Sequence, residues 1–286
     1  MSFQKTLKDI SALKIQGAEN IALAAVKALA VSRSANLMKS AEALMQTRPT
    51  EPCMRNVINY FLQASKQRGP QEALREITEF FNHSDRRISR LGARLIRDRQ
   101  IIFTHCHSGT VVNAFLEAKK QRKVFQVNNT ETRPLYQGRK TAKDLAKAGI
   151  PCTLYVDSGA RLAMKNASKV FLGCDAITGK GVIINKIGSE MFCEVAKNYR
   201  IPVYVLTNSW KYDFSTDFGF EEKIEQRHVS EVWKAPPRGL KVSNYAFEQI
   251  SPKLVKGIVS ELGILRPKEF VRGVHKKYPF LRRKLE

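Results

Sequence analysis

A cysteine lies between two histidines in the segment Thr104–Thr110, THCHSGT, which follows an apolar stretch. A thiol transfers protons near neutral pH when its surroundings tune its pKa. The serine, glycine and threonine after it are typical of a helix N-terminus, which attracts anions and lowers the pKa of a nearby thiol, especially beside charged histidines. Cys106 is therefore a candidate proton-transfer residue, with His107 and Ser108 as candidate anion ligands. The alternative is a small core residue for Cys106 and a packing role for His105 and His107.

A carboxylate and several cations follow other apolar stretches. Asp175 lies in GCDAI, Asn185 and Lys186 lie in INKIGS, Arg133 lies in ETRP and Lys211 lies in NSWK. A carboxylate in a partly desolvated site can transfer protons, and arginine or lysine can bind phosphate. Each also has a structural alternative: Asp175 could cap the segment after its strand, Arg133 could pair with the nearby glutamate, and Lys186 could be a solvated strand end.

The elements that carry these residues alternate between short apolar runs and helix-like stretches. Candidate strands are Ile101–Cys106, Val124–Asn128, Cys152–Val156, Val170–Gly173, Val182–Ile184 and Val203–Thr207, and candidate helices between them are Val111–Gln121, Gln137–Ala148 and Ser189–Tyr199. This order predicts an α/β fold with a Rossmann-like, mostly parallel sheet covered by helices on both faces. Because ligands bind beyond the carboxyl ends of parallel strands, we expect the polar residues to meet at one edge of one sheet.

The first part of the chain has a different pattern. From Phe3 to about Arg97, apolar residues recur at intervals of three and four, which is typical of amphipathic helices. Helix-breaking residues occur near positions 32–34, 48–49 and 68–70. The sequence therefore predicts an N-terminal helical bundle over residues 1–97 and a Rossmann-like catalytic and dimerisation domain over residues 98–286.

Composition narrows the classes of partner. Lys and Arg total 49 against 26 Asp and Glu, a formal net charge of +23, which attracts anions such as phosphorylated metabolites. The basic residues lack interleaved aromatic residues, so a solvated surface is favoured over nucleic-acid binding. The five cysteines have neither CxxC pairs nor metal-ligand spacing, which favours free thiols and no metal. With no membrane-length apolar run and no export signal, we expect a cytoplasmic protein.

Four motifs resemble the initiation-factor-2B-related family when read in chain order. They are THCHSGT, NNTETRPLYQGRKTAKDLAKAGIP, GCDAITGKGVIINKIGS and SWKY, and the resemblance extends to Gln16-Gly17-Ala18 and to QTRPT around Arg48. The family includes ribose-1,5-bisphosphate isomerases, methylthioribose-1-phosphate isomerases and regulatory subunits of the translation exchange factor. The resemblance covers nearly the whole chain, and the HCHS context is most similar to the archaeal ribose-1,5-bisphosphate isomerases.

The resemblance implies particular roles for the residues that match it. The isomerases use a cysteine and an aspartate at the positions of Cys106 and Asp175, and the exchange-factor subunits generally lack that pair. An aldose–ketose isomerase acting on ribose 1,5-bisphosphate is therefore implied, with Cys106 and Asp175 as acid–base pair and no cofactor. The residues implied in binding substrate or phosphate are Gln16, Gly17, Ala18, Arg48, His107, Ser108, Arg133, Asn185, Lys186 and Lys211.

Two alternatives and three departures accompany this expectation. The alternatives are a methylthioribose-1-phosphate isomerase and a non-catalytic regulatory subunit that binds a sugar phosphate or nucleotide. Gln16 replaces the usual arginine and supplies no charge, Cys174 replaces the usual alanine, and the segment 244–248 reads NYAFE where the family favours NPAFD. Family members pair through their C-terminal domains, so the resemblance also implies a homo-oligomer, either a dimer or a hexamer built from dimers.

Overall fold

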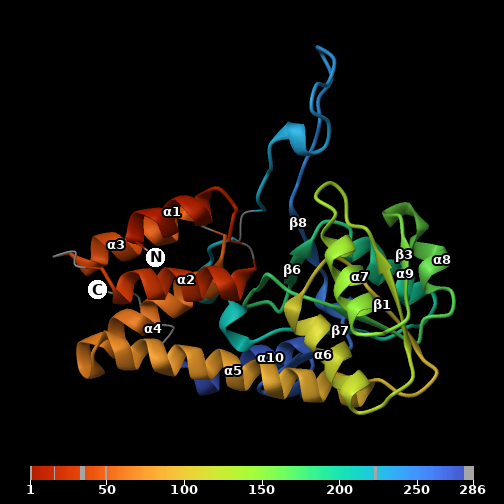
Figure 1. The fold of residues 1–286 in the computed structure, drawn as a ribbon, viewed down its shortest axis with the longest axis horizontal. Helices are drawn as coiled ribbons and strands as arrows, with labels where there is room; N and C mark the ends of the chain where they lie inside the picture. Colours follow the sequence, from red (N-terminus) through yellow and green to blue (C-terminus); the bar gives the residue numbers. More distant parts are fainter. Residues whose placement is uncertain (1, 16, 33–35, 49, 222–223, 280–286) are drawn as a thin grey trace.

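The N-terminal part of the chain is a bundle of helices. A computed structural model describes residues 2–15, 17–32, 36–48, 50–221 and 224–279. The bundle consists of α1 (Phe3–Ser11), α2 (Ala18–Ala30), α3 (Leu37–Thr47), α4 (Pro52–Arg68) and the first half of α5 (Pro70–Leu95), as Figure 1 shows. Proline begins α4 and α5, where its missing N–H costs no helical hydrogen bond. Of the helices in these residues, none is long and apolar enough to cross a membrane.

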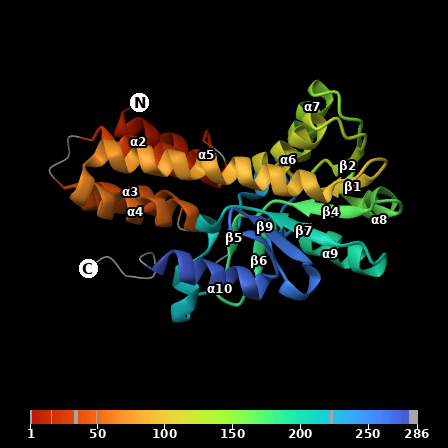
Figure 2. The same cartoon turned by 90° about the horizontal axis from the view of Figure 1, so that it is seen from below.

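Helix α5 is 26 residues long and joins the bundle to the sheet (Figures 1 and 2). Its first buried residues, Ala73, Ile77 and Phe81, belong to the core of the bundle. Its later buried residues, Ile88 and Ala93, pack with the helices that cover the sheet. The division of the chain at residues 97 and 98 stays a prediction.

The main sheet has seven strands in the order β10-β9-β7-β4-β1-β2-β3, and all neighbours are parallel except β10 and β9. The strands are β1 (Ile101–Thr104), β2 (Gln126–Thr130), β3 (Cys152–Tyr155), β4 (Lys169–Leu172), β7 (Val203–Leu206), β9 (Gly257–Ser260) and β10 (Gly263–Leu265). Phe103 of the central β1 lies opposite Asn128 of β2 and Val170 of β4. The predicted mostly parallel sheet is confirmed.

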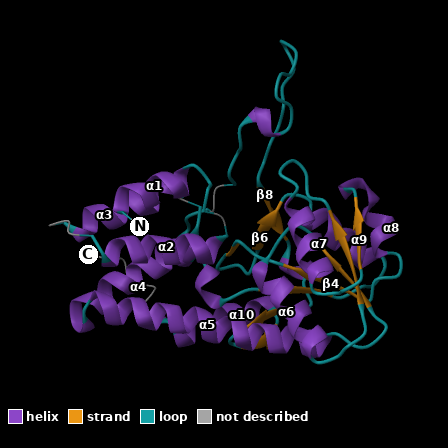
Figure 3. Ribbon diagram, viewed as in Figure 1, coloured by secondary structure: helices purple, strands orange, loops and turns teal. Residues whose placement is uncertain are grey.

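Helices cover both faces of this sheet (Figure 3), as the sequence predicted. The covering helices are α6 (Gly109–Lys120), α7 (Gln137–Lys147), α8 (Ala160–Met164), α9 (Ser189–Asn198) and α10 (Pro267–Lys277). Side chains alternate along the strands: Ile102 and Phe171 pack with α6, while Phe103 and Val170 pack with α8 and α9. This alternation follows from the two-residue period of a strand.

A second sheet, which the sequence analysis missed, has three antiparallel strands in the order β5-β6-β8. They are β5 (Ala176–Ile177), β6 (Ile183–Lys186) and β8 (Phe247–Ile250). The expectation that Val182–Ile184 joins the one parallel sheet is therefore wrong. The chain turns at Thr178–Val182, where Gly181 has a φ of +75° and the Thr178 N–H donates to the Val182 carbonyl. A tight turn reverses the chain, whereas a parallel pair needs a long crossover.

A long arm, described over residues 219–221 and 224–245, leaves the body and returns into β8 (Figure 1). Its base is a two-stranded contact, in which Arg227 N–H donates to the Asn244 carbonyl at 2.8 Å and Ala246 N–H donates to the Glu225 carbonyl at 2.9 Å. Its outer part is exposed and carries Trp233. The base of the arm therefore has a fixed position beside the second sheet.

Candidate active site

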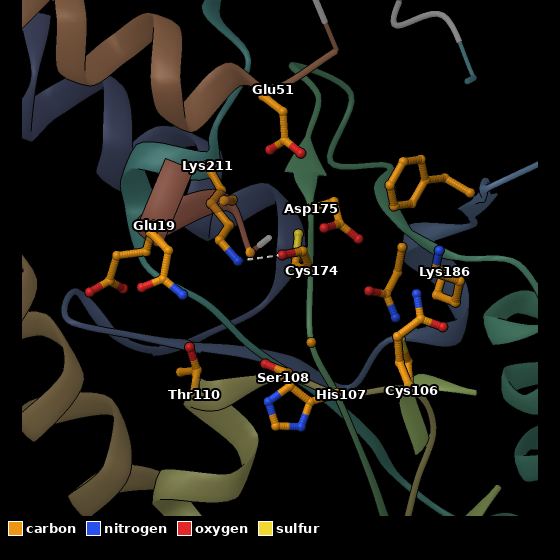
Figure 4. Close-up of a pocket in the computed structure, with 18 of the residues that line it drawn as sticks. Glu19, Glu51, Cys106, His107, Ser108, Thr110, Cys174, Asp175, Lys186 and Lys211 are labelled. Carbon is orange, nitrogen blue, oxygen red and sulfur yellow. Dashed lines mark hydrogen bonds between the residues drawn. The ribbon is translucent and has the colours of Figure 1, made fainter. Parts of the chain in front are cut away.

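A pocket of about 510 Å³ lies where the bundle, the main sheet and the second sheet meet. Figure 4 shows Cys106, His107 and Ser108 on one side and Asp175 with Lys211 across from them. The sequence-predicted residues that line it are Gly17, Ala18, Arg48, Cys106, His107, Ser108, Asp175, Asn185, Lys186 and Lys211. Gln16 lies outside the described residues, and Arg133 does not line the pocket.

Cys106 follows β1 at the point where the chain turns into α6. Its φ is +66°, a left-handed conformation that costs a non-glycine residue energy and needs support. Two threonines supply that support: Cys106 N–H donates to Thr132 Oγ1 at 3.0 Å, and Thr141 Oγ1 donates to the Cys106 carbonyl at 2.8 Å. The Cys106 backbone is therefore fixed by contacts with residues of the next βα unit.

The pKa of the Cys106 thiol is raised to about 11, because burial disfavours the thiolate more than Lys186 and the His107 N–H favour it. The expected lowering of this pKa is therefore wrong. Burial also lowers the pKa of both neighbouring histidines, for His105 to about 4. Neutral imidazoles give no positive charge to stabilise a thiolate, so Cys106 rests as the thiol at neutral pH.

The two histidines beside Cys106 have different positions. His105 is buried, with Nδ1 facing Thr130 Oγ1 and Nε2 at 2.9 Å from the Ile187 carbonyl, so it packs between the two sheets. His107 faces the pocket, where its Nε2 accepts from Lys140 Nζ at 2.8 Å. Its Nδ1 therefore carries the hydrogen and donates to Thr141 Oγ1 at 3.1 Å. His107 thus fits the predicted site-lining role, and His105 fits the packing alternative.

The N-terminus of α6 opens onto the pocket. Ser108 is the N-cap residue, and its side chain accepts from Val111 N–H at 3.5 Å. Gly109 and Thr110 of the first turn line the pocket, so their backbone amides give it partial positive charge. A Cβ atom on Gly173, at the end of β4, would lie 2.7 Å from the Ser108 Cβ. Glycine at 173 therefore lets α6 approach β4 this closely.

Asp175 begins the link from β4 into the second sheet, and its N–H donates to the Ile184 carbonyl at 2.9 Å. Burial raises the pKa of this carboxyl, and three cations, Lys211, Lys186 and Arg48, act against the shift. Lys211 is only 9% exposed, and its ammonium donates to the Cys174 carbonyl at 2.6 Å (Figure 4). Burial acts to lower the pKa of Lys211, but the neighbouring carboxylates, Asp175 first, raise it overall.

Asn185 and Lys186 end β6 on the opposite side of the pocket from the bundle. Asn185 is buried, and its amide donates to Ser189 Oγ at 2.9 Å, which joins β6 to the start of α9. The Lys186 ammonium lies 4.8 Å from the centre of the Phe247 ring. Both residues line the pocket, but they come from the second sheet and not from the parallel one.

Arg48 lies between two carboxylates. Its guanidinium is 2.9 Å from Glu51 Oε1 and 3.4 Å from Glu225 Oε2. Glu51 is 4% exposed, and its Oε2 has no hydrogen-bond partner among the residues that the structure describes. Burial, with Asp175 and Glu225 nearby, raises the pKa of Glu51 to about 7 despite the contact with Arg48. A phosphate that reached Arg48 would compete with these carboxylates.

Several pocket residues were not found from the sequence. They are the acids Glu19, Glu51, Asp85 and Glu225 and the cations Lys140 and Arg227. Burial raises the pKa of Glu19 to about 7, and it also raises the pKa of Asp85. Glu19 and Glu51 lie next to the motifs around Gly17 and Arg48 in the sequence. Their nearness to these motifs could have identified them as pocket residues. Nothing in the sequence around Asp85, in the middle of a helix, or around Arg227, in the arm, indicates that either residue lines the pocket.

Arg133 does not line the pocket and instead bonds to other segments of the chain. Its backbone N–H donates to Asp157 Oδ2 at 2.7 Å, and its guanidinium donates to the Tyr136 hydroxyl and to the Val232 carbonyl of the arm. The nearby Glu131 pairs instead with Arg139 at 2.9 Å. Neither the expected place of Arg133 in the pocket nor its pairing with Glu131 is found. Arg133 joins the strand end to the arm.

A family model, related sequences and a solved structure each match most of this chain. The model of the initiation factor 2 subunit family matches residues 11–267. The ribose 1,5-bisphosphate isomerase of Thermococcus kodakarensis is 35% identical, with 90% of this chain and 89% of the relative covered. The methylthioribose-1-phosphate isomerase of Geotalea daltonii is 31% identical, with 92% and 87% covered. The structure of the translation initiation factor eIF-2B of Pyrococcus horikoshii superposes with a TM-score of 0.84 at 25% identity, covering 94% of this chain and 98% of the other.

Proposed function

The chain belongs to the initiation factor 2 subunit family, and from that premise we propose that it is an isomerase converting ribose 1,5-bisphosphate to ribulose 1,5-bisphosphate. The observation that carries the proposal is the lining of one pocket by a thiol and a carboxyl, Cys106 and Asp175, together with cations from five separate segments. These cations are Arg48, Lys140, Lys186, Lys211 and Arg227. A substrate with two phosphates needs cations at both of its ends.

The reaction needs one proton donor and one proton acceptor. A sugar phosphorylated on its anomeric oxygen cannot open as a hemiacetal does, so the ring oxygen must be protonated as its bond to C1 breaks. The hydrogen on C2 then moves to C1, and the C2 hydroxyl loses its proton to give the ketone. The proton gained by the ring oxygen equals the proton lost from the hydroxyl, so the isomerisation is balanced without a co-reactant.

Cys106 and Asp175 suit these two roles. Because the pKa of Cys106 is about 11, the residue enters the reaction as a thiol and can donate its proton to the ring oxygen. Lys186, which acts to lower that pKa, stabilises the thiolate that remains. Asp175 faces three cations that favour its ionised form, so it accepts the proton of the C2 hydroxyl. Solvent returns the proton from Asp175 to Cys106 after each turnover.

The test is product formation from α-ribose 1,5-bisphosphate by the wild type, Cys106→Ser and Asp175→Asn. We expect ribulose 1,5-bisphosphate from the wild type and a loss of about 10²–10⁴-fold in kcat for each variant. Binding of the bisphosphate without ketose formation by the wild type would refute the proposal. Methylthioribose 1-phosphate is then the next substrate, and failure there would leave a regulatory, ligand-binding subunit.

The path of the hydrogen is decided by running the reaction in deuterated water. Deuterium at C1 of the product means that the C2 hydrogen leaves as a proton and exchanges with solvent. Its absence means direct transfer from C2 to C1. With direct transfer, the one donor and one acceptor above suffice. With exchange, a further acceptor must take the proton from C2 and a donor must supply the proton at C1.

Assembly into a homo-oligomer is part of the same proposal. It rests on family resemblance, with the sheet domain as the pairing surface. Light scattering of the purified chain measures the mass directly, and the mass of one 32.4 kDa chain would refute it.

A further inference from the structure

The basic residues in the two halves of α5 differ in whether they pair with carboxylates. In the first half, Arg75 contacts Glu72 and Glu79 of the same helix, and Arg68 just before the helix lies 2.9 Å from Glu76. These exposed pairs neutralise the charges of Arg68 and Arg75. The second half of the same helix has no such pairs among its described residues.

A groove of about 450 Å³ runs along this second half. We call it the arginine groove, and it is lined by His83, Arg86, Arg87, Arg90, Leu91 and Arg94. The four arginines and the histidine are exposed. They recur at three- and four-residue intervals, so they share one helix face. No described residue makes a salt bridge with any of these arginines; Arg86 donates only to the Asn82 carbonyl of its own helix.

The surface next to the arginine groove adds to its charge. Helix α6 packs along α5 (Figure 2), and its C-terminal end carries the exposed Lys119, Lys120 and Arg122. Two carboxylates nearby have other partners: Glu117 accepts from the Gln121 amide at 2.8 Å, and Asp98 accepts from the Val124 N–H at 2.8 Å. Both carboxylates keep their negative charge, but neither forms a salt bridge among the described residues, and the cations of this surface outnumber them.

We propose that the arginine groove binds the phosphodiester backbone of a nucleic acid, without regard to sequence. The first and last of Arg87, Arg90 and Arg94 are seven residues apart, about 10 Å along the helix, which matches about three phosphates of one duplex strand. Arginine binds phosphate oxygens in a bidentate manner. The lining residues include no Phe, Tyr or Trp for stacking on bases, and the contacts are made to phosphates, so we expect binding without regard to sequence.

An anionic membrane is the less suitable partner. Helices that lie on membranes insert apolar side chains beside their basic ones. Leu91 is the one apolar residue that lines the groove, and it is half-buried. The buried face of this half of α5 is covered by α6 and the sheet, since a Cβ on Gly92 would lie 2.7 Å from the Ala114 Cβ. No apolar face is left for insertion.

The arginine groove is separate from the pocket. None of its lining residues lines the pocket, although Asp85 of the same helix does. Substitutions in the groove therefore leave the catalytic residues in place. This separation makes failure of the groove proposal distinguishable from failure of the isomerase proposal.

The experiment measures binding of a fluorescein-labelled 20-base-pair DNA duplex of arbitrary sequence by anisotropy, over a range of salt concentrations. The variant is R87Q/R90Q/R94Q. The matched control is R161Q/K165Q/R200Q, which removes the same charge from exposed residues of the opposite sheet face. We expect the groove variant to bind at least about tenfold more weakly and its log–log salt slope to fall by about 3, while the control changes little.

Equal losses in the two triple variants would overturn the proposal, because they would show a diffuse effect of net charge on a solvated surface. Tighter binding to vesicles of anionic lipid than to duplex would also overturn it. Circular dichroism checks the fold of each variant, and R90E alone repeats the test if the triple variant unfolds. A loss confined to R90E or to the groove triple supports the proposal.

Discussion

The pocket and the arginine groove both concentrate positive charge, but their surroundings differ. In the pocket, Arg48 lies against two carboxylates and Lys211 against a carbonyl and Asp175. In the groove, no described carboxylate pairs with the arginines. Charge that is buried must be balanced, and it is then held in one geometry. Charge that is exposed is stabilised by water and stays available to any polyanion.

The largest effect on stability and on kcat is expected from removing the charge of Lys211, which Asp175 balances. Lys211→Met leaves the Cys174 carbonyl without its donor and removes the first of the cations that oppose the raised pKa of Asp175. We expect a loss of about 1–3 kcal/mol in the free energy of unfolding by urea titration. We also expect a fall in kcat of about 10²-fold. Arg90→Met in the groove is the control. Equal losses of stability in both variants would show that the balanced charge of the pocket is no more important for folding than the exposed charge of the groove.

A smaller, pH-dependent effect is expected at Glu51. Its pKa is about 7 in the folded chain against an ordinary value of 4.5, so folding favours the protonated form. That stability is fully present below pH 4.5 and is lost as the pH rises through 7. Glu51→Gln keeps a neutral side chain at every pH. Relative to wild type, the variant should gain on the order of 2 kcal/mol between about pH 5 and pH 8 in urea titrations. A constant difference across this range would contradict the raised pKa.

A near-zero effect on folding is expected in the groove. The R87Q/R90Q/R94Q variant removes like charges that repel one another and lack carboxylate partners, so its stability should lie within about 0.5 kcal/mol of wild type. Its kcat for the bisphosphate should be unchanged. Thermal unfolding and the isomerase assay measure both, and a clear loss of stability would mean that these arginines have structural partners.

The smallest effect is expected in the first half of α5. Arg75→Gln removes an exposed arginine that already contacts Glu72 and Glu79. Its charge is locally cancelled, so duplex affinity should change by less than about twofold. A loss as large as that of Arg90→Gln, measured by the same anisotropy titration, would show that pairing with carboxylates does not decide which arginines bind the duplex.

The sequence predicted well what local patterns determine. The helices of the bundle, the parallel strands and the polar residues that follow β1 and β4 agree with periodicity and with the rule for the ends of parallel strands. The match to family motifs predicted ten pocket residues that the structure brings together. These features depend on short stretches of chain.

What the sequence did not predict depends on residues far apart in the chain. Asp85 reaches the pocket because α5 is long enough to pass it, and Arg227 reaches it because the arm folds back. The raised pKa of Cys106 comes from burial by several elements at once, which the neighbouring histidines and helix N-terminus could not reveal. The second sheet was not predicted, because it depends on the tight turn at Thr178–Val182 that pairs β5 with β6 in antiparallel fashion.

The tip of the arm is a site where a protease can cut the folded chain. Its exposed tip carries Lys234, Arg238 and Lys241, which are the residues after which trypsin cuts. A single cut there would yield two fragments, the second of which holds β8 and β9, each paired with a strand of the first fragment. Both sheets would hold the fragments together without a covalent link. The chain is therefore suited to fragment complementation after a cut at the tip of the arm.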